Sequence, residues 1–346
     1  MIRLRSLLPK KIISYSSNRM AKICTEVSSM TDSEVSTWFH SFDTVMTDCD
    51  GVLWVGAEPI VGSPEMINRF RDLGKRVFYV TNNSTKHRRE YKVKLDKLGF
   101  GGSMDEIIGT AYLAALYLEQ VNMDKSKLVY VVGSSGITQE LDDVGIKYLP
   151  IGPDSVHKDG NIETLETLKH KSVTLDPDVV AVIAGFDINI SFNKILKGAS
   201  YANRPGAVFI ATNTDEQFPM PGTELIIPGT GSMVAAVATA AGKQPVVLGK
   251  PSKFMFEIVQ KRHPGILPER TLMIGDRANT DILLGKNCGL QTLLVGSGVH
   301  SLAETRTWEA SEEAEQQRMV ADYYADKLGD LLDRVTQLES NDGGSK

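Results

Sequence analysis

Four short apolar runs of this chain each end on a polar residue that phosphoryl transfer could use. Short runs rich in Val, Ile and Leu, separated by helical patterns, are typical of buried strands in a parallel sheet. Ligands of such sheets bind beyond the carboxyl ends of the strands. If the four strands lie side by side, a carboxylate nucleophile, a hydroxyl group, an ammonium group and a metal-binding carboxylate meet in one crevice. The runs are residues 44–47 before Asp48, 76–80 before Thr81, 245–249 before Lys250 and 271–275 before Asp276.

Asp48 and Asp50 stand two positions apart where the first strand is expected to end, and Gly51 follows them. Residues i and i+2 of a strand share a face, so both carboxylates can face one pocket. Asp48 can attack phosphorus to form an aspartyl phosphate, and Asp50 can move a proton to or from the leaving oxygen. Taken alone, the pair also fits a calcium loop or two turn aspartates.

The next two motifs supply phosphate-binding groups. Thr81, Asn82 and Asn83 offer a hydroxyl group, amides and free backbone N–H groups, although the same residue types are common in turns and helix caps. Two carboxylates and a phosphate within ~4 Å repel by about 4 kcal/mol per pair at an effective dielectric constant of 20, so the site needs cations. Lys250 can supply one positive charge, although an isolated lysine is more often a solvated surface residue.

A metal ion can supply the remaining positive charge. Asp276 follows the fourth strand and Asp281 stands in the next loop or first helical turn. Oxygen ligands without His or Cys favour Mg²⁺. We expect Asp48, Asp276 and the backbone carbonyl of Asp50 to bind Mg²⁺, with Asp281 supporting these ligands from behind. Two acidic residues at the start of a helix are the alternative.

The order of elements predicts an α/β fold with a Rossmann-like, doubly wound parallel sheet and an inserted α/β cap domain. A complete second set of strands and helices separates the Thr81 strand from the Lys250 strand. The expected division is a basic N-terminal tail over 1–37, a catalytic core over 38–123 and 243–335, a cap over 124–242 and a flexible tail over 336–346.

Composition excludes several classes of protein. The formal net charge of −5 argues against binding of nucleic acid backbones as the main function. The three cysteines are widely spaced and predict neither a disulfide framework nor a zinc site. No apolar run approaches the ~20 residues of a membrane-spanning helix, so we expect no membrane partner. The first 25 residues are basic and contain no acid, which suits either a tail of a cytoplasmic protein or a mitochondrial transit peptide.

The four motifs together resemble those of the haloacid dehalogenase-like superfamily, within the branch of phosphoglycolate, pyridoxal phosphate and 4-nitrophenyl phosphatases. The resemblance covers roughly residues 38 to 335. It implies an Asp48 nucleophile, an Asp50 acid and base, phosphate binding by Thr81, Asn82 and Lys250, and Mg²⁺ on Asp48, Asp50 and Asp276. It also implies a homodimer formed through the caps. The motifs read DCDGVLW from residue 48, TNNS from 81, GKPS from 249, and GDR from 275 with TDI from 280.

The loop over 213–219 resembles the segment with which the caps of this family close over the leaving group. Asp215 and Phe218 are therefore candidates for substrate specificity, although Phe218 could instead pack inside the cap. A compact apolar side chain there favours a small ester, so we expect the activity of a Mg²⁺-dependent phosphoglycolate phosphatase. The alternatives are a phosphatase of pyridoxal phosphate or another small-molecule or protein substrate, a phosphomutase or phosphonatase, and a phospho-ligand binding protein without turnover.

Overall fold

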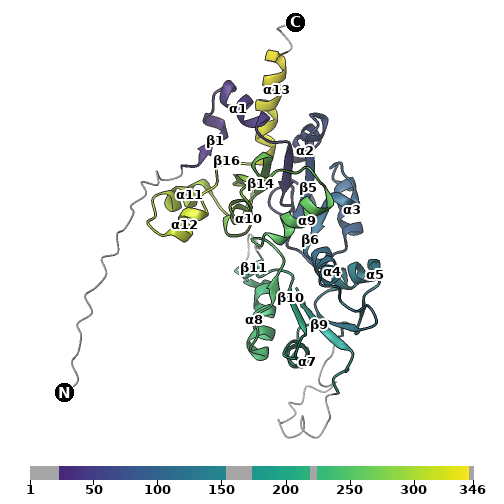
Figure 1. Cartoon of the computed structure of the whole chain (residues 1–346). Helices are drawn as coiled ribbons and strands as arrows, with labels where there is room; N and C mark the ends of the chain where they lie inside the picture. The colour runs from purple at the N-terminus through teal and green to yellow at the C-terminus, as the bar shows by residue number, and fades with distance from the viewer. Residues whose placement is uncertain (1–22, 153–173, 219–223, 343–346) are drawn as a thin grey trace, which may run out of the picture.

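The computed structural model describes residues 23–152, 174–218 and 224–342. Its larger sheet has seven parallel strands in the order β1-β16-β15-β14-β2-β5-β6. A second parallel sheet has the order β13-β10-β9-β7-β8 and lies at the other end of the molecule (Figure 1). The strands of the large sheet are β1 (Thr25–Glu26), β16 (Tyr323–Ala325), β15 (Gln291–Val295), β14 (Thr271–Gly275), β2 (Thr44–Thr47), β5 (Arg76–Thr81) and β6 (Ile107–Gly109). Those of the second sheet are β13 (Val246–Val247), β10 (Val208–Ala211), β9 (Val179–Ala184), β7 (Leu128–Val132) and β8 (Lys147–Tyr148).

Helices cover both faces of the large sheet. Since alternate residues of a strand point to opposite sides, neighbouring strand residues pack against different helices. Val45 and Val77 belong to a hydrophobic cluster with residues of α1, α2 and α13. Met46 and Phe78 belong to another cluster with residues of α4 and α9. The α-helices are α1 (Asp32–His40), α2 (Ser63–Asp72), α3 (Arg88–Lys97), α4 (Thr110–Gln120), α5 (Ser135–Asp143), α7 (Phe192–Ala202), α8 (Thr230–Ala241), α9 (Phe254–Arg262), α10 (Leu283–Cys288), α11 (Leu302–Glu309), α12 (Ala314–Arg318) and α13 (Leu331–Asp342).

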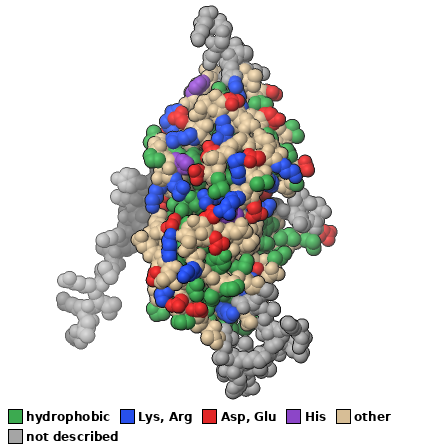
Figure 2. Space-filling view, turned by 90° about the vertical axis from the view of Figure 1, so that its right-hand side faces the viewer, with side chains coloured by type: hydrophobic (Ala, Val, Ile, Leu, Met, Phe, Trp, Pro, Cys, Tyr) green, Lys and Arg blue, Asp and Glu red, His purple; other side chains and the backbone are tan. Residues whose placement is uncertain are grey.

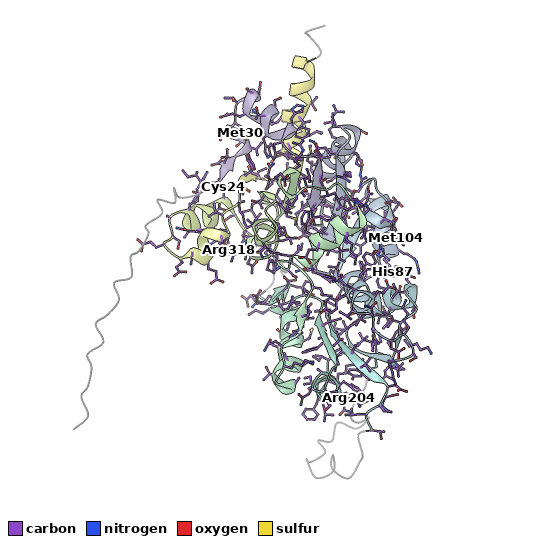
Figure 3. All side chains as sticks on the ribbon, viewed as in Figure 1. Cys24, Met30, His87, Met104, Arg204 and Arg318 are labelled. Carbon is purple, nitrogen blue, oxygen red and sulfur yellow. The ribbon has the colours of Figure 1, made fainter. Side chains whose placement is uncertain are left out.

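The second sheet forms the cap, and a buried polar cluster ties it to the core. His87 and Arg88 stand at the start of α3 (Figure 3), and Glu140 and Asp143 lie on α5. His87 Nε2 lies 2.9 Å from Asp143 Oδ2, and Arg88 Nη2 lies 2.9 Å from Glu140 Oε2. The hydrophobic cluster that contains Met46 also includes residues of cap strands β7 and β9. The cap is therefore held on the core by apolar packing, by the buried Arg88–Glu140 ion pair and by the His87–Asp143 contact.

The fold corrects the expected position of the strand before Lys250. Residues 245–249 were expected to form a strand of the core sheet, but β13 pairs in parallel with β10 of the cap, with Val246 opposite Ile210. Leu248 and Gly249 continue this pairing through their backbone N–H groups. A short apolar run does not specify which sheet it joins, because periodicity is local whereas strand pairing is made between distant segments.

The expected ends of the core are also corrected. The predicted N-terminal tail over 1–37 is wrong for its last part, because β1 pairs with β16 and Val35 of α1 is buried. Helix α13 continues to Asp342, so the tail expected from residue 336 starts within a helix. Residues 1–22 of the predicted basic tail over 1–37 lie outside the described residues.

Lys, Arg, Asp and Glu side chains are interspersed on the face of the molecule that Figure 2 shows. None of the described helices is long and apolar enough to cross a membrane.

Candidate active site

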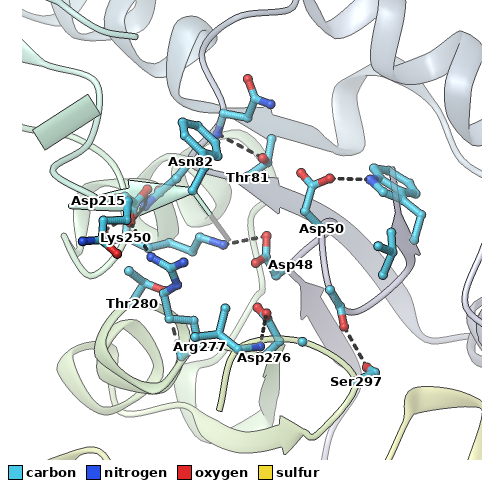
Figure 4. Close-up of a pocket in the computed structure, with 18 of the residues that line it drawn as sticks. Asp48, Asp50, Thr81, Asn82, Asp215, Lys250, Asp276, Arg277, Thr280 and Ser297 are labelled. Atoms are coloured by element: carbon cyan, nitrogen blue, oxygen red, sulfur yellow. Dashed lines mark hydrogen bonds and ion pairs between the residues drawn. The ribbon is translucent and has the colours of Figure 1, made fainter. Parts of the chain in front are cut away.

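Three of the four predicted strands are neighbours, in the order β14-β2-β5. Asp48, Thr81 and Asp276 therefore stand together at the carboxyl ends of these strands, as Figure 4 shows. The backbone N–H of Asp48 donates to the carbonyl of Ile274 at 2.8 Å, which fixes the end of β2 against β14. Gly51 has φ +82°, and a side chain there would collide with the Asp276 carboxylate. The turn after β2 therefore requires glycine for its conformation and for space.

Lys250 reaches the same place from the edge of the cap sheet. Its ammonium lies 2.7 Å from Asp48 Oδ1 and 2.8 Å from Asp281 Oδ1, and the residue is 2% exposed. Asn82 holds the backbone of Lys250 on both sides, because its Oδ1 accepts from Lys250 N at 2.8 Å and its Nδ2 donates to Lys250 O at 3.1 Å. The loop after β5 thus positions the lysine directly.

Asp48, Asp276 and Asp281 form an acidic cluster whose ligand oxygens lie within 4.8 Å of one another. Asp281 and Asp276 are buried, and the Asp48 side chain is 13% exposed. Asp281 packs on Gly275, where any larger residue would collide with it. Three carboxylates face one ammonium, so the cluster carries excess negative charge before a phosphate arrives. Hard oxygen ligands with this charge fit Mg²⁺.

The pKa values of the cluster reflect burial and mutual repulsion. Burial raises the pKa of Asp48 well above its ordinary value, the Lys250 ammonium opposes the shift, and the Asp281 and Asp276 carboxylates add to it. Burial and then the Asp281 carboxylate raise the pKa of Asp276 to about 6. Burial alone would lower the pKa of Lys250, but the Asp281 and Asp48 carboxylates outweigh it and raise that pKa.

The Asp50 side chain is exposed to the cavity and lies outside the acidic cluster. Its Oδ1 accepts a hydrogen bond from Trp54 Nε1 at 2.8 Å. The carboxylates of Asp48 and Asp50 thus have different partners, an ammonium for the first and an indole N–H for the second. This difference suits a nucleophile and a proton carrier, respectively.

A cavity of about 340 Å³ opens above these groups. The core lines it with Asp48, Asp50, Thr81 and Lys250, among others, and the cap contributes Asp215, Gln217 and Phe218. The site is therefore assembled from both domains.

Comparison with known proteins agrees with this geometry. A family model of haloacid dehalogenase-like hydrolases matches residues 45–147, and a HAD-hydrolase-like model matches residues 247–331. Glycerol-3-phosphate phosphatase of Rattus norvegicus is 43% identical over 84% of this chain and 90% of its own length. Phosphoglycolate phosphatase 1A, chloroplastic, of Arabidopsis thaliana is 39% identical over 84% of this chain and 77% of its own length.

The chain belongs to the haloacid dehalogenase-like hydrolase family. Among solved structures, a glycerol phosphate phosphatase from Mycobacterium tuberculosis in complex with magnesium superimposes with a TM-score of 0.65 at 25% identity, covering 84% of this chain and 77% of that one. The curated relatives are phosphatases, and the protein is a phosphoric monoester hydrolase of this family.

The loop after β5 of this hydrolase forms a turn at the edge of the cavity. Thr81, Asn82 and Asn83 all line the cavity. Asn83 also forms a turn, because its Oδ1 accepts from Thr85 N at 2.9 Å and from Thr85 Oγ1 at 2.6 Å. The Thr81 hydroxyl accepts from Asn83 N at 3.1 Å. The hydrogen bonds of this turn thus hold the side chains that line the cavity, and their binding of phosphate stays a prediction.

The two cap candidates both face the cavity. The Asp215 carboxylate accepts from Asn82 Nδ2 at 3.1 Å and lies 3.9 Å from Arg277 Nη1. Asp215 therefore contacts the loop after β5 and also lines the cavity. Phe218 lines the cavity and also makes an edge-on contact with Phe186, with ring centroids 5.0 Å apart. Phe218 thus borders both the cap and the cavity, and its role in substrate specificity stays a prediction.

Sequence reasoning missed Trp54 and Arg277 as site residues. Both line the cavity, and both belong to motifs that were recognised, DCDGVLW and GDR. The available signal was their place in these motifs, Trp54 four positions after Asp50 and Arg277 directly after Asp276. The loop after β15 was missed entirely, although Val299 N donates to Asp276 Oδ2 at 2.9 Å and Ser297 Oγ donates to Gly51 O at 2.7 Å.

Proposed function

We propose that the protein hydrolyses phosphate monoesters of small metabolites through an aspartyl phosphate on Asp48, with Mg²⁺ as cofactor and phosphoglycolate as the preferred substrate. The observation that carries the proposal is the meeting of Asp48, Asp50, Lys250 and Asp276 in one cavity of about 340 Å³. A binding protein without turnover would not need both a buried carboxylate beside an ammonium and a second carboxylate open to the same space.

The acidic cluster supports Mg²⁺ as the cofactor. Asp48 and Asp276 would hold the ion with their carboxylates, and we keep the main-chain carbonyl of Asp50 as the third ligand from the protein. Asp281 lies behind this set and holds Lys250. When bound, Mg²⁺ neutralises phosphate charge and orients the phosphorus for in-line attack.

The chain's own residues then carry two steps. In the first, an Asp48 oxygen attacks phosphorus, the bond from phosphorus to the ester oxygen breaks, and Asp50 gives its proton to the departing alcohol. In the second, the Asp50 carboxylate takes a proton from a water that attacks phosphorus, the bond to Asp48 breaks, and inorganic phosphate leaves. Lys250, Thr81 and Asn82 hold the phosphate oxygens throughout.

The cavity supports a small leaving group, and Arg277 supports an anionic one. Arg277 lines the cavity, is 17% exposed in its side chain, and has its guanidinium 3.9 Å from the Asp215 carboxylate. The carboxylate of phosphoglycolate can pair with this guanidinium. Glycerol 3-phosphate is the second candidate, because relatives that act on it share about two fifths of their residues with this chain, 43% in the rat protein.

The deciding experiment compares kcat/KM for phosphoglycolate, glycerol 3-phosphate and pyridoxal phosphate in the wild type and in Arg277→Met. We expect the substitution to lower kcat/KM for phosphoglycolate by about tenfold or more, the value of one charge-assisted contact, and to affect glycerol 3-phosphate much less. Arg262→Met is the matched control, because Arg262 makes an ion pair with Asp105 away from the cavity. A wild-type preference for glycerol 3-phosphate, with equal losses in Arg277→Met, would refute the phosphoglycolate assignment.

We also propose a homodimer formed through the cap and a cytoplasmic location, with mitochondrial import through residues 1–22 as the alternative. The family resemblance supports the dimer, and the basic composition of the leader supports the import. Sedimentation equilibrium of the purified chain, and imaging of the full chain against a chain lacking residues 1–22, test the two statements.

A further inference from the structure

Trp54 stands beside the proton-carrying residue of the site. Its Nε1–H donates to Asp50 Oδ1 at 2.8 Å, a contact drawn as a dashed line at Asp50 in Figure 4. Within the described residues, it is the one side-chain hydrogen bond that the Asp50 carboxyl makes. The turn after β2 produces the contact, because Gly51 N donates to Trp54 O at 2.9 Å and Trp54 N donates to Cys49 O at 3.3 Å. The chain thus folds back and sets the indole against the carboxyl four residues earlier.

The indole ring is held firmly in this position. Trp54 is fully buried and contacts the edge of Phe100, with ring centroids 5.9 Å apart. The Lys94 ammonium lies 3.9 Å from the ring centroid and donates to Gly56 O at 2.9 Å, which fixes the hairpin of β3 (Trp54–Val55) and β4 (Glu58–Pro59) over the ring. A donor that is fixed on both sides presents its N–H in one direction only.

We infer that Trp54 is a positioning residue that dictates which oxygen of Asp50 carries the transferable proton. The inference deepens the proposed function and rests on it. A protonated carboxyl has one proton and two oxygens, and its carbonyl oxygen is a stronger hydrogen-bond acceptor than its hydroxyl oxygen. An N–H that faces Oδ1 therefore favours the proton on Oδ2. Without the indole N–H, the carboxyl can rotate and place its proton on either oxygen.

The consequence depends on the leaving group. When the ester bond breaks, an alkyl alcohol must receive the Asp50 proton on its departing oxygen, whereas 4-nitrophenolate is a stable anion and leaves without a proton. General acid catalysis contributes about 10²- to 10⁴-fold where it is needed. In the second step Asp50 is an ionised carboxylate that accepts a proton, so no protonated oxygen has to be selected there. Misdirection of the proton should therefore act in the first step only, where it should cost part of this factor for alkyl esters and almost none for the aryl ester.

The test measures kcat and KM of the full-length enzyme in excess MgCl₂ for glycerol 3-phosphate and 4-nitrophenyl phosphate. Trp54→Phe should lower kcat for glycerol 3-phosphate by about tenfold and kcat for 4-nitrophenyl phosphate by less than about twofold, with KM little changed for either. If the phenylalanine variant folds poorly, Trp54 can instead be replaced by 3-benzothienylalanine, in which sulfur takes the place of the indole N–H at nearly the same size. This replacement should give the same selective loss.

Trp38→Phe is the matched control. Trp38 is buried in the same hydrophobic cluster as Trp54, and its Nε1 has no hydrogen-bond partner among the described residues. This variant should leave the ratio of the two kcat values at its wild-type level. It removes a buried indole of the same size whose N–H makes no hydrogen bond to a described residue.

A double-mutant cycle closes the test. In an Asp50→Asn background, Trp54→Phe should no longer change the ratio of the two kcat values, because the proton it directs is gone. Equal losses for both esters in Trp54→Phe and in the benzothienylalanine variant would overturn the inference and leave the phosphatase assignment intact. Failure of the wild type to hydrolyse either ester would overturn the proposed function, and the inference with it.

Discussion

Replacement of Lys250 by methionine should destabilise the folded protein as well as stop turnover. The ammonium is 2% exposed and lies within 2.8 Å of carboxylate oxygens of both Asp48 and Asp281. A pair of unit charges ~4 Å apart interacts by roughly 4 kcal/mol at an effective dielectric constant of 20. Removal of one partner from a buried pair costs about 3–5 kcal/mol, because the other charge stays buried. We expect the free energy of unfolding to fall by that amount near neutral pH without metal.

The loss should depend on pH with a definite sign. Burial already raises the pKa of Asp48 in spite of Lys250, so removal of the ammonium raises that pKa further. A carboxyl whose pKa is higher in the folded state than in the unfolded state costs the most stability above its folded pKa, and the cost shrinks as the pH falls from that value towards the unfolded pKa. The deficit of Lys250→Met should therefore shrink in acid. Excess MgCl₂ should also reduce it, because the ion replaces the missing positive charge.

Urea unfolding followed by circular dichroism measures these effects, with Lys194→Met as the matched control. Lys194 is equally buried, at 2% exposed, and its ammonium lies 2.6 Å from Asp187 in the cap, away from the acidic cluster. The control should lose stability, keep kcat/KM close to the wild-type value, and gain nothing from MgCl₂. Acid should relieve both variants, because each leaves a buried carboxylate without its ammonium, so MgCl₂ is the discriminating condition. If MgCl₂ restored the two variants equally, or neither, Lys250 would not act by neutralising the cluster.

Three further predictions concern the nucleophile and the metal. Asp48→Asn should abolish phosphate release while the urea midpoint stays at or above the wild-type value, since it removes one buried charge; substantial turnover would contradict covalent catalysis. Calcium should inhibit, because it takes more oxygen ligands than magnesium and can bind both oxygens of Asp48; equal rates in CaCl₂ and MgCl₂ would argue against that ligand. Magnesium affinity, measured by titration calorimetry, should fall about tenfold per pH unit below about 6, where the raised pKa of Asp276 makes protons compete; an affinity independent of pH in that range would exclude Asp276 as a ligand.

Most of the catalytic set could be predicted from the sequence because it depends on local features. Apolar runs define β2, β5 and β14, and parallel strands bring their carboxyl ends to one edge of a sheet. Asp48, Thr81 and Asp276 follow directly from that rule, and these strands are neighbours in the structure.

Other features were beyond the reach of local patterns because they depend on which distant segments pack together. β13 joins the cap sheet through backbone pairing with β10, a choice that two valines do not encode. β1 is only two residues long and gains its place by pairing with β16, almost 300 residues away in the chain, with Thr25 opposite Tyr323.

The same distinction applies to the charged groups of the site: their presence could be predicted from local sequence, whereas their partners depend on packing between distant segments. Residue types and their spacing predict that two aspartates, a threonine, a lysine and a further acidic pair are available for phosphoryl transfer. Packing between distant segments places the Lys250 ammonium against both Asp48 and Asp281, and the Trp54 indole against Asp50. The reason is physical: residue types set which hydrogen bonds and ion pairs can form, whereas burial and the packing of side chains from several segments select the ones that do.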